Sequence, residues 1–240
     1  MQTVDFERIA FRTGDTVLDL GCGEGRHVIS AYLEADVHSF GVDLSHSDLL
    51  ITQKKCDEFS SAKSASENTS FGLAQTNALA LPFADHTFDT IICSEVLEHI
   101  DDYQSVIAEI QRILKPGGQF VASVPRYWPE WICWAFSDEY HANEGGHLRI
   151  FKSSQLREQI ENAGFSFFAR HWAHALHSPY WWLQCMFWKN KDKSSLVRNY
   201  RRFLEWDILD QPLFTRTLEA LLNPLMGKSV VMYFRKGVSQ

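Results

Sequence analysis

Three closely spaced glycines and a later acid are the residues whose types and spacing could do chemistry in this chain. An apolar segment runs directly into Gly21, Gly23 and Gly25, and a second apolar segment ends at Asp43. Glycine lets the backbone approach a ligand where a side chain would collide, and the helix expected over 25–33 points its N-terminus at the turn. An acid about 20 residues after such a turn is placed to accept hydrogen bonds from ribose hydroxyls. The pattern predicts a site for a nucleoside cofactor.

The residues around the turn disfavour a dinucleotide. Where the third glycine of the pyrophosphate-binding pattern is needed, the chain has Arg26 or Val28, depending on which glycine is taken as the first. Asp19 and Glu24 would also repel a pyrophosphate. The same acids would attract S-adenosylmethionine, which carries a sulfonium and an ammonium group. A nicotinamide-dependent oxidoreductase is therefore the weakest of the functions considered.

Four segments in order resemble the class I S-adenosylmethionine-dependent methyltransferases, and specifically the branch with an E-V-L-E-H motif. They are VLDLGCGEG at 17–25, GVDLS at 41–45, NALALPFADHTFDTIICSEVLEHI at 77–100 and ILKPGGQFVASVP at 113–125. Together they span residues 16–125, about half of the chain. This resemblance implies S-adenosylmethionine as the cofactor and methyl transfer as the reaction.

The resemblance also implies which residues bind the cofactor. The glycine turn would hold the methionine end, Asp43 the ribose, the segment starting at Asn77 the adenine, and the end of the fourth strand would lie near the sulfur. The family usually has aspartate at the position of Asn77, whose amide oxygen can still accept from the adenine amino group. The expected cofactor-binding residues are Asp19, Gly21, Cys22, Gly23, Gly25, Asp43, Leu44, Asn77, Ala78, Leu79, Ser94 and Glu95.

Alternating apolar runs and helical patterns predict an α/β fold, a doubly wound and mostly parallel sheet. The resembled fold has seven strands, the last antiparallel at the edge, here with a helical insertion before it. We expect residues 1–240 to form a single methyltransferase domain. Strands are expected near 16–21, 37–43, 69–75, 87–94, 118–124, 165–172 and 229–234. Helices are expected near 25–34, 46–60, 103–114 and 153–163, and a surface loop over 60–70.

Two further segments are expected to cover the methyl acceptor, namely 126–150 and the insertion at 174–228. All eight tryptophans lie between 128 and 206, and the insertion carries eight Lys/Arg against five acids in a protein of net charge −7. Aromatic residues beside a basic block suggest a lid over an apolar acceptor or contact with an anionic membrane surface. In such a lid, the side chains expected to face the acceptor are Tyr180, Trp181, Trp182 and Phe187. The alternative is that the tryptophans fill the core of added helices.

His147 and His99 are the candidate catalytic residues. His147 lies in a polar, glycine-hinged stretch at 140–149, from which it could take the proton of a hydroxyl during methyl transfer. His147 with Arg149 resembles the H-x-R stretch of small-molecule methyltransferases, although Arg149 could equally pair with Glu95 or Glu144. His99 follows the fourth strand, near the cofactor, and a capping role is the alternative there.

No metal site is predicted from the sequence. His171, His174 and His177 are spaced by three, but the first two fall on or at the end of a strand, where that spacing points to opposite faces. A second group has ligand types without a recognised spacing. It comprises Asp138, Glu139, His141, Glu144 and His147.

Composition limits which binding partners and which cellular compartment we expect for this protein. Five scattered cysteines without paired spacing are typical of a reduced, cytoplasmic environment, with membrane association limited to the surface. The acidic balance and the absence of the Pro-Pro-aromatic motif of base-amine methyltransferases after the fourth strand disfavour nucleic acid. A small-molecule or lipid-like acceptor is expected, with O-methylation slightly favoured, and the oligomeric state stays open. The alternative function is a non-catalytic S-adenosylmethionine-binding regulatory or scaffold module.

Overall fold

One seven-stranded sheet organises the part of the chain that the computed structural model describes, residues 2–60, 69–142 and 145–238. The strand order is β3-β2-β1-β4-β5-β7-β6, with β7 antiparallel to both of its neighbours and the other pairings parallel. The strands are β1 (Thr16–Leu20), β2 (His38–Asp43), β3 (Ser70–Gln75), β4 (Phe88–Ser94), β5 (Leu114–Pro125), β6 (Phe165–Ala173) and β7 (Ser229–Lys236). This is the α/β doubly wound sheet that the alternating pattern predicts.

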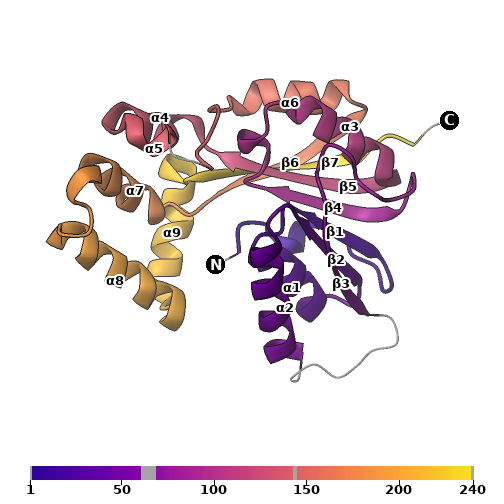
Figure 1. The fold of residues 1–240 in the computed structure, drawn as a ribbon, viewed down its shortest axis with the longest axis horizontal. Coiled ribbons are helices and arrows are strands. Elements are labelled where there is room, and N and C mark those ends of the chain that lie inside the picture. The colour runs from indigo at the N-terminus through magenta and orange to yellow at the C-terminus, as the bar shows by residue number, and fades with distance from the viewer. Residues whose placement is uncertain (1, 61–68, 143–144, 239–240) are drawn as a thin grey trace.

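Helices cover both faces of the sheet, as Figure 1 shows. On one side lie α1 (Arg26–Glu34) and α2 (His46–Ser60), and on the other α3 (Tyr103–Ile113) and α6 (Ser153–Asn162). The apolar face of α3 buries Ile107 and Ile110 against Ile91 and Phe120 of the central strands, all nearly inaccessible to solvent. Burial of such side chains is the main stabilising contribution to the fold. The carboxyl end of the parallel strands is thereby held as a rigid edge.

The remaining helices gather at one end of the sheet (Figure 1). They are α4 (Tyr127–Phe136), α5 (Asp138–Ala142), α7 (His177–Met186), α8 (Ser195–Asp210) and α9 (Leu213–Met226). The described residues also form three short 3-10 helices, η1 (Phe6–Arg8), η2 (Leu97–His99) and η3 (Trp188–Asn190). The insertion before the last strand is therefore helical, as expected. No helix in the described residues is long and apolar enough to span a membrane.

The order of the last strands differs from the expectation. β7 is antiparallel but lies between β5 and β6, so β6 forms the edge. The burial of the two strands gives the reason. β7 is buried along nearly its whole length, as an interior strand must be, whereas β6 alternates between buried and exposed positions, which is typical of an edge.

Two boundaries also differ. β5 begins at Leu114 and not near residue 118, because Leu114 pairs with Phe88 before a register shift in the segment that contains Pro116 and Gly117. The stretch at 140–149, expected as a loop, begins inside α5 and is irregular from Gly145. Most of the loop expected over 60–70 lies outside the described residues.

Candidate active site

The glycine turn between β1 and α1 has the tight geometry that its sequence predicts. Gly21 has a φ of 72°, and a Cβ placed there would lie 2.4 Å from Cγ2 of Val96. The backbone N–H groups of Gly21 and Cys22 both donate to the carbonyl of Val42, at 2.8 and 3.0 Å. The turn therefore bridges the ends of β1 and β2 and leaves no room for a larger residue at its start.

Asp43 at the end of β2 fixes the other side of the turn. Its two carboxylate oxygens accept from the backbone N–H of Gly23 and of Ser45, each at 2.8 Å. Each carboxylate oxygen can accept more than one hydrogen bond. The carboxylate therefore both orders the turn and keeps acceptor capacity for a ribose.

Asp19 lies behind the turn and lines neither of the two cavities at this edge of the sheet. It is 2% exposed and accepts from the backbone N–H of Val28 at 3.0 Å. Burial raises the pKa of Asp19 to about 7, an effect that the Val28 hydrogen bond only partly offsets. Its position supports a role in fixing the start of α1, in place of the direct cofactor contact expected from the sequence.

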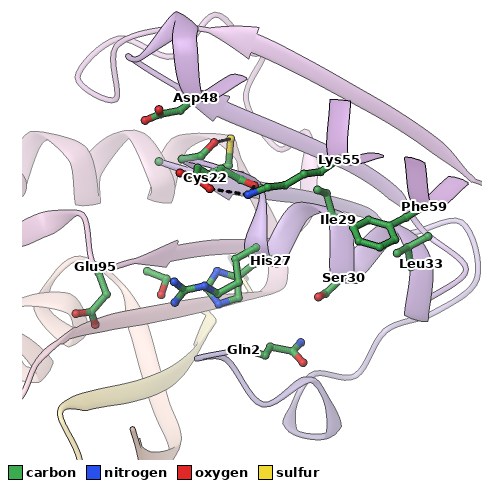
Figure 2. A pocket seen from close by; sticks show the side chains of 16 residues that line it. Gln2, Cys22, His27, Ile29, Ser30, Leu33, Asp48, Lys55, Phe59 and Glu95 are labelled. Carbon is green, nitrogen blue, oxygen red and sulfur yellow. Dashed lines mark hydrogen bonds and ion pairs between the residues drawn. The ribbon is translucent and has the colours of Figure 1, made fainter. Parts of the chain in front are cut away.

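Two cavities meet at this edge of the sheet. The larger, about 860 Å³, follows the glycine turn, and Figure 2 shows Asp48 and Glu95 approaching it from different elements. The second, about 560 Å³, contains Asp43 and Leu44. Gly21, Asp48 and Glu95 line both. Of the other predicted cofactor residues, Cys22, Gly23, Gly25 and Ser94 line the first cavity, and Asn77 and Ala78 line the second.

The adenine end differs in one detail from the expectation. The side-chain oxygen of Asn77 accepts from the backbone N–H of Leu79 at 3.0 Å and so closes a local turn. That oxygen keeps one lone pair for a ligand. Leu79 is not a lining residue of either cavity and is 40% exposed.

Glu95 is held in an unusual backbone conformation at the floor of both cavities. Its φ is 58°, a left-handed value rare for residues other than glycine. Ser123 on the neighbouring strand β5 holds it, because its hydroxyl donates to the Glu95 carboxylate at 2.9 Å and lies 2.8 Å from the Ser94 hydroxyl. Backbone strain of this kind persists where surrounding contacts over-determine it, as at functional sites.

The segment 146–149 runs beside η2 and brings the two candidate catalytic histidines together. His99 Nδ1 donates to the carbonyl of Gly146 at 3.2 Å, and the N–H of Leu148 donates to the carbonyl of Glu98 at 3.0 Å. The rings of His99 and His147 lie 4.9 Å apart between centroids. His99 and Gly145 line the second cavity. The histidines therefore lie at the same end of the sheet as the predicted cofactor residues.

Arg149 anchors this segment. Its guanidinium hydrogen-bonds the carbonyl of Ile100, lies 3.4 Å from Asp101 and packs 4.8 Å from the ring of Tyr103. It does not pair with Glu95, and Glu144 lies outside the described residues. Arg149 thus anchors the segment that carries His147, two residues earlier in the chain.

Glu130 orients His147, although Glu130 is not among the site residues predicted from the sequence. His147 Nδ1 donates to the Glu130 carboxylate at 2.6 Å, and Trp134 and Tyr140 also donate to that carboxylate. Glu130 is 1% exposed. Burial acts to raise its pKa, but the contacts with His147, Lys228 and Tyr140 together outweigh burial, and the pKa lies below its ordinary value. Its signal in the sequence was that it is the one charged residue in the apolar run 127–136.

Burial also shapes the titration of His99. It lowers the pKa of His99 below the ordinary value, and the neighbouring His147 adds to the effect. The imidazole is therefore neutral at physiological pH. A neutral ring whose Nδ1 donates its proton presents an unprotonated Nε2.

The aromatic residues of the insertion line neither of the two cavities at this site. Tyr180 stacks with Tyr200, and Trp181 and Phe187 pack on the same cluster between α7 and α8. Trp182 packs against Trp128 and donates to the carbonyl of Pro129 at 3.0 Å. The expectation that these four side chains face an acceptor is wrong, because they form the core of the insertion and its contact with α4.

The three histidines spaced by three in the sequence do not all lie together. His171 contacts the backbone of Thr3 and the hydroxyl of Tyr233. His174 and His177 instead lie together near Glu219. In the second group considered from the sequence, at 138–147, His147 pairs with Glu130. Glu144 of that group is outside the described residues.

Comparison with known proteins decides the family. A family model described as a methyltransferase domain matches residues 4–168. The chain belongs to the class I S-adenosylmethionine-dependent methyltransferases.

Two curated methyltransferases illustrate the match. An O-methyltransferase named rstn1 from Aspergillus nomiae is 34% identical over 113 residues, 47% of this chain and 48% of the relative. A probable S-adenosylmethionine-dependent methyltransferase from Mycolicibacterium smegmatis is 30% identical over 163 residues, 68% of this chain and 56% of the relative.

Solved methyltransferase structures share the fold. The geranyl diphosphate methyltransferase in complex with S-adenosylmethionine has a TM-score of 0.63 at 16% identity, covering 96% of this chain and 82% of that one. Phosphoethanolamine N-methyltransferase 2 of Haemonchus contortus, also with the cofactor bound, has a TM-score of 0.58 at 17% identity, covering 98% and 51%. The chain spans about half the length, or less, of most curated methyltransferases that it matches.

Proposed function

We propose that this methyltransferase transfers the methyl group of S-adenosylmethionine to a hydroxyl of a small or lipid-like acceptor. One observation carries the proposal. The hydrogen-bonded pair of half-buried His147 and buried Glu130 lies beside His99, which shares a cavity with the predicted ribose and adenine residues Asp43 and Asn77. This arrangement supports a role for His147 as the group that takes the proton of the acceptor.

The chemistry needs alignment and the removal of one proton. A lone pair on the acceptor oxygen forms a bond to the methyl carbon, the carbon–sulfur bond breaks, and its electrons neutralise the sulfonium. The hydroxyl proton then passes to His147. Glu130 fixes the tautomer of His147 and stabilises the charge that His147 gains. Glu95 and Asp48 supply negative charge near the cationic cofactor. Much of the rate would come from orientation in the cavity.

The helices around the site support an enzyme over a non-catalytic binding module. A module of that kind would be favoured by an acceptor space filled with the protein's own tryptophans. The tryptophans of α7 instead pack on α8 and α4. We propose that α4, α5 and the segment 145–149 cover the acceptor, and that the insertion braces α4 and thereby Glu130.

A product-release assay tests the reaction class. We expect S-adenosylhomocysteine release with hydroxyl-bearing polar or isoprenoid acceptor pools, and little with matched pools whose hydroxyls are capped as methyl ethers. A methyl-labelled cofactor would confirm that the label reaches the acceptor. Equal release from free and capped pools, with label on nitrogen or carbon, would contradict O-methylation.

An exposed surface of the insertion supports contact with an anionic membrane. Arg198, Arg202 and Leu209 follow each other at helical spacing along one face of α8, and Leu209 is 81% exposed. The turn into α9 adds Leu213 and Phe214, which are 80% and 72% exposed. Basic side chains above exposed apolar ones are typical of helices that lie in a membrane interface. We propose that this surface brings the enzyme to a lipid-like acceptor.

Vesicle co-sedimentation tests the membrane contact. We expect anionic vesicles at low salt to pellet more protein than neutral ones. Replacing Arg198 and Arg202 with glutamine should weaken that binding roughly thirtyfold, because each basic residue near an anionic surface contributes about 1 kcal/mol. Lys54→Gln on α2 removes one exposed charge elsewhere and is the control. Equal binding to both vesicle types would make the basic stretch a solvated helix face.

A further inference from the structure

Glu98, His99 and His147 form a cluster whose geometry goes beyond a proton acceptor. One potential ligand atom of each lies within 4.8 Å of the others. Glu98 and His99 belong to η2, while His147 comes from a segment almost 50 residues later in the chain. The hydrogen bond from Leu148 to Glu98 and the one from His99 to Gly146 hold the two segments together. The backbone thus fixes the three side chains before any ligand arrives.

Glu98 is the unexplained member of the cluster. Its side chain is 0% exposed, and neither carboxylate oxygen has a hydrogen-bond partner within the described residues. Buried carboxylates are normally paired, hydrogen-bonded or bound to a cation, because burial without a partner is costly. The nearest candidate is His99, whose Nε2 lies 4.0 Å from Glu98 Oε1. Glu98 therefore points to a missing positive partner.

Both histidines have the second contact that metal-binding histidines have. His147 donates from Nδ1 to the Glu130 carboxylate at 2.6 Å, and His99 donates from Nδ1 to the Gly146 carbonyl at 3.2 Å. A ligating histidine almost always gives its other ring N–H to a carboxylate or a backbone carbonyl, which fixes its tautomer. In both rings the Nδ1 hydrogen bond leaves Nε2 as the nitrogen available to a metal ion.

We propose that Glu98, His99 and His147 bind one divalent transition-metal cation, of the Zn²⁺ kind, with open positions for oxygens of the acceptor. Two imidazoles and one carboxylate suit such ions, whereas magnesium and calcium prefer oxygen ligands. The charge around Glu98 is negative on balance, because Glu95 and Glu130 both act on it against the single positive charge of Lys228. The expectation from the sequence that no metal site exists is replaced by this proposal.

The second cluster of the same composition lacks this support. His174, His177 and Glu219 also bring ligand atoms within 4.8 Å. Arg26 and Lys228 both act on the two histidines there, whereas at Glu98 the charge of Lys228 is opposed by Glu95 and Glu130, and positive charge disfavours a cation. His174 also hydrogen-bonds Thr3 at 3.0 Å through Nε2. This cluster is the natural control for the first.

The metal would deepen the proposed function, and its catalytic role rests on that function. A cation that coordinates the acceptor hydroxyl lowers the pKa of that hydroxyl as a Lewis acid. The proton passes to solvent water, the metal-bound alkoxide attacks the methyl carbon, and the carbon–sulfur bond breaks with its electrons on sulfur. His147 would then act as a ligand, with Glu130 as its positioning residue.

Metal binding can be measured without any turnover. We expect metal-free protein to bind Co²⁺ at one site with the visible absorption of a nitrogen-coordinated ion, and Zn²⁺ to displace it. Glu98→Gln and His147→Ala should each weaken Co²⁺ binding at least tenfold, and Glu130→Gln should weaken it roughly 10- to 100-fold. His177→Asn in the other cluster should leave it unchanged. Thermal unfolding of each variant checks that it folds.

Several results would overturn the proposal. They are a lack of binding at one equivalent of Co²⁺, binding that Glu98→Gln leaves unchanged, and binding that His177→Asn removes. Full turnover by metal-free enzyme would overturn the catalytic role while leaving the proposed function intact. Conversely, a loaded site in a protein that methylates no hydroxyl acceptor would sink the proposed function and leave the metal site standing.

Discussion

Replacing His147 with alanine should lower turnover about a hundredfold or more, while the affinity for S-adenosylmethionine changes less than about twofold. The variant removes the group that we propose acts on the acceptor proton, whether directly or as a ligand of a bound cation. The cofactor contacts of Asp43 and the glycine turn stay in place. Steady-state kinetics and calorimetry on the same preparations measure the two quantities.

His38→Ala is the matched control, since His38 hydrogen-bonds Ser70 at the far end of β2. It should leave turnover unchanged. Glu130→Gln should fall in the same direction as His147→Ala, because it removes the charge that orients the imidazole. If His147→Ala keeps near wild-type turnover, His147 is structural and the acceptor loses its proton elsewhere.

Replacing Asp43 with alanine should weaken S-adenosylmethionine binding by about 1.5–3 kcal/mol, or roughly 10- to 150-fold in Kd. The carboxylate provides charged acceptors for the ribose and also orders the turn through Gly23 and Ser45. Asp43→Asn should have a smaller effect because one oxygen acceptor remains. Calorimetric titration with S-adenosylhomocysteine measures both variants.

Asp57→Ala controls for the lost charge, because Asp57 is exposed on α2 and lines neither cavity. Unfolding measurements on Asp43→Ala separate a damaged turn from a lost ligand contact. An unchanged Kd in a folded Asp43→Ala variant would remove Asp43 from the ribose site.

The sequence was sufficient for the parts of the site that depend on local pattern. Gly21 and Asp43 could be found because a parallel sheet ends its strands at one edge, and each residue directly follows a buried apolar run. The strand order beyond β5 could not be found the same way. Whether β7 or β6 takes the edge depends on pairings between strands more than 50 residues apart, which no local pattern specifies.

The acceptor side was partly hidden for the same reason. His147 and His99 were selected singly, but their meeting requires the long-range packing of 146–149 on η2. Glu130 and Glu98 read as ordinary charges in a sequence, and only their burial shows that they act on the histidines. Tyr180 misled because aromatic residues serve a lid and a helix core equally well.

Calorimetric titration of the wild-type protein with S-adenosylmethionine and, separately, with NAD tests the central claim most directly. The site described here predicts one equivalent of bound S-adenosylmethionine and no detectable heat from NAD at the same concentrations. The reason is that Asp48 and Glu95 line the cavity and favour a cationic ligand over a pyrophosphate. Tight NAD binding together with no binding of S-adenosylmethionine would contradict it.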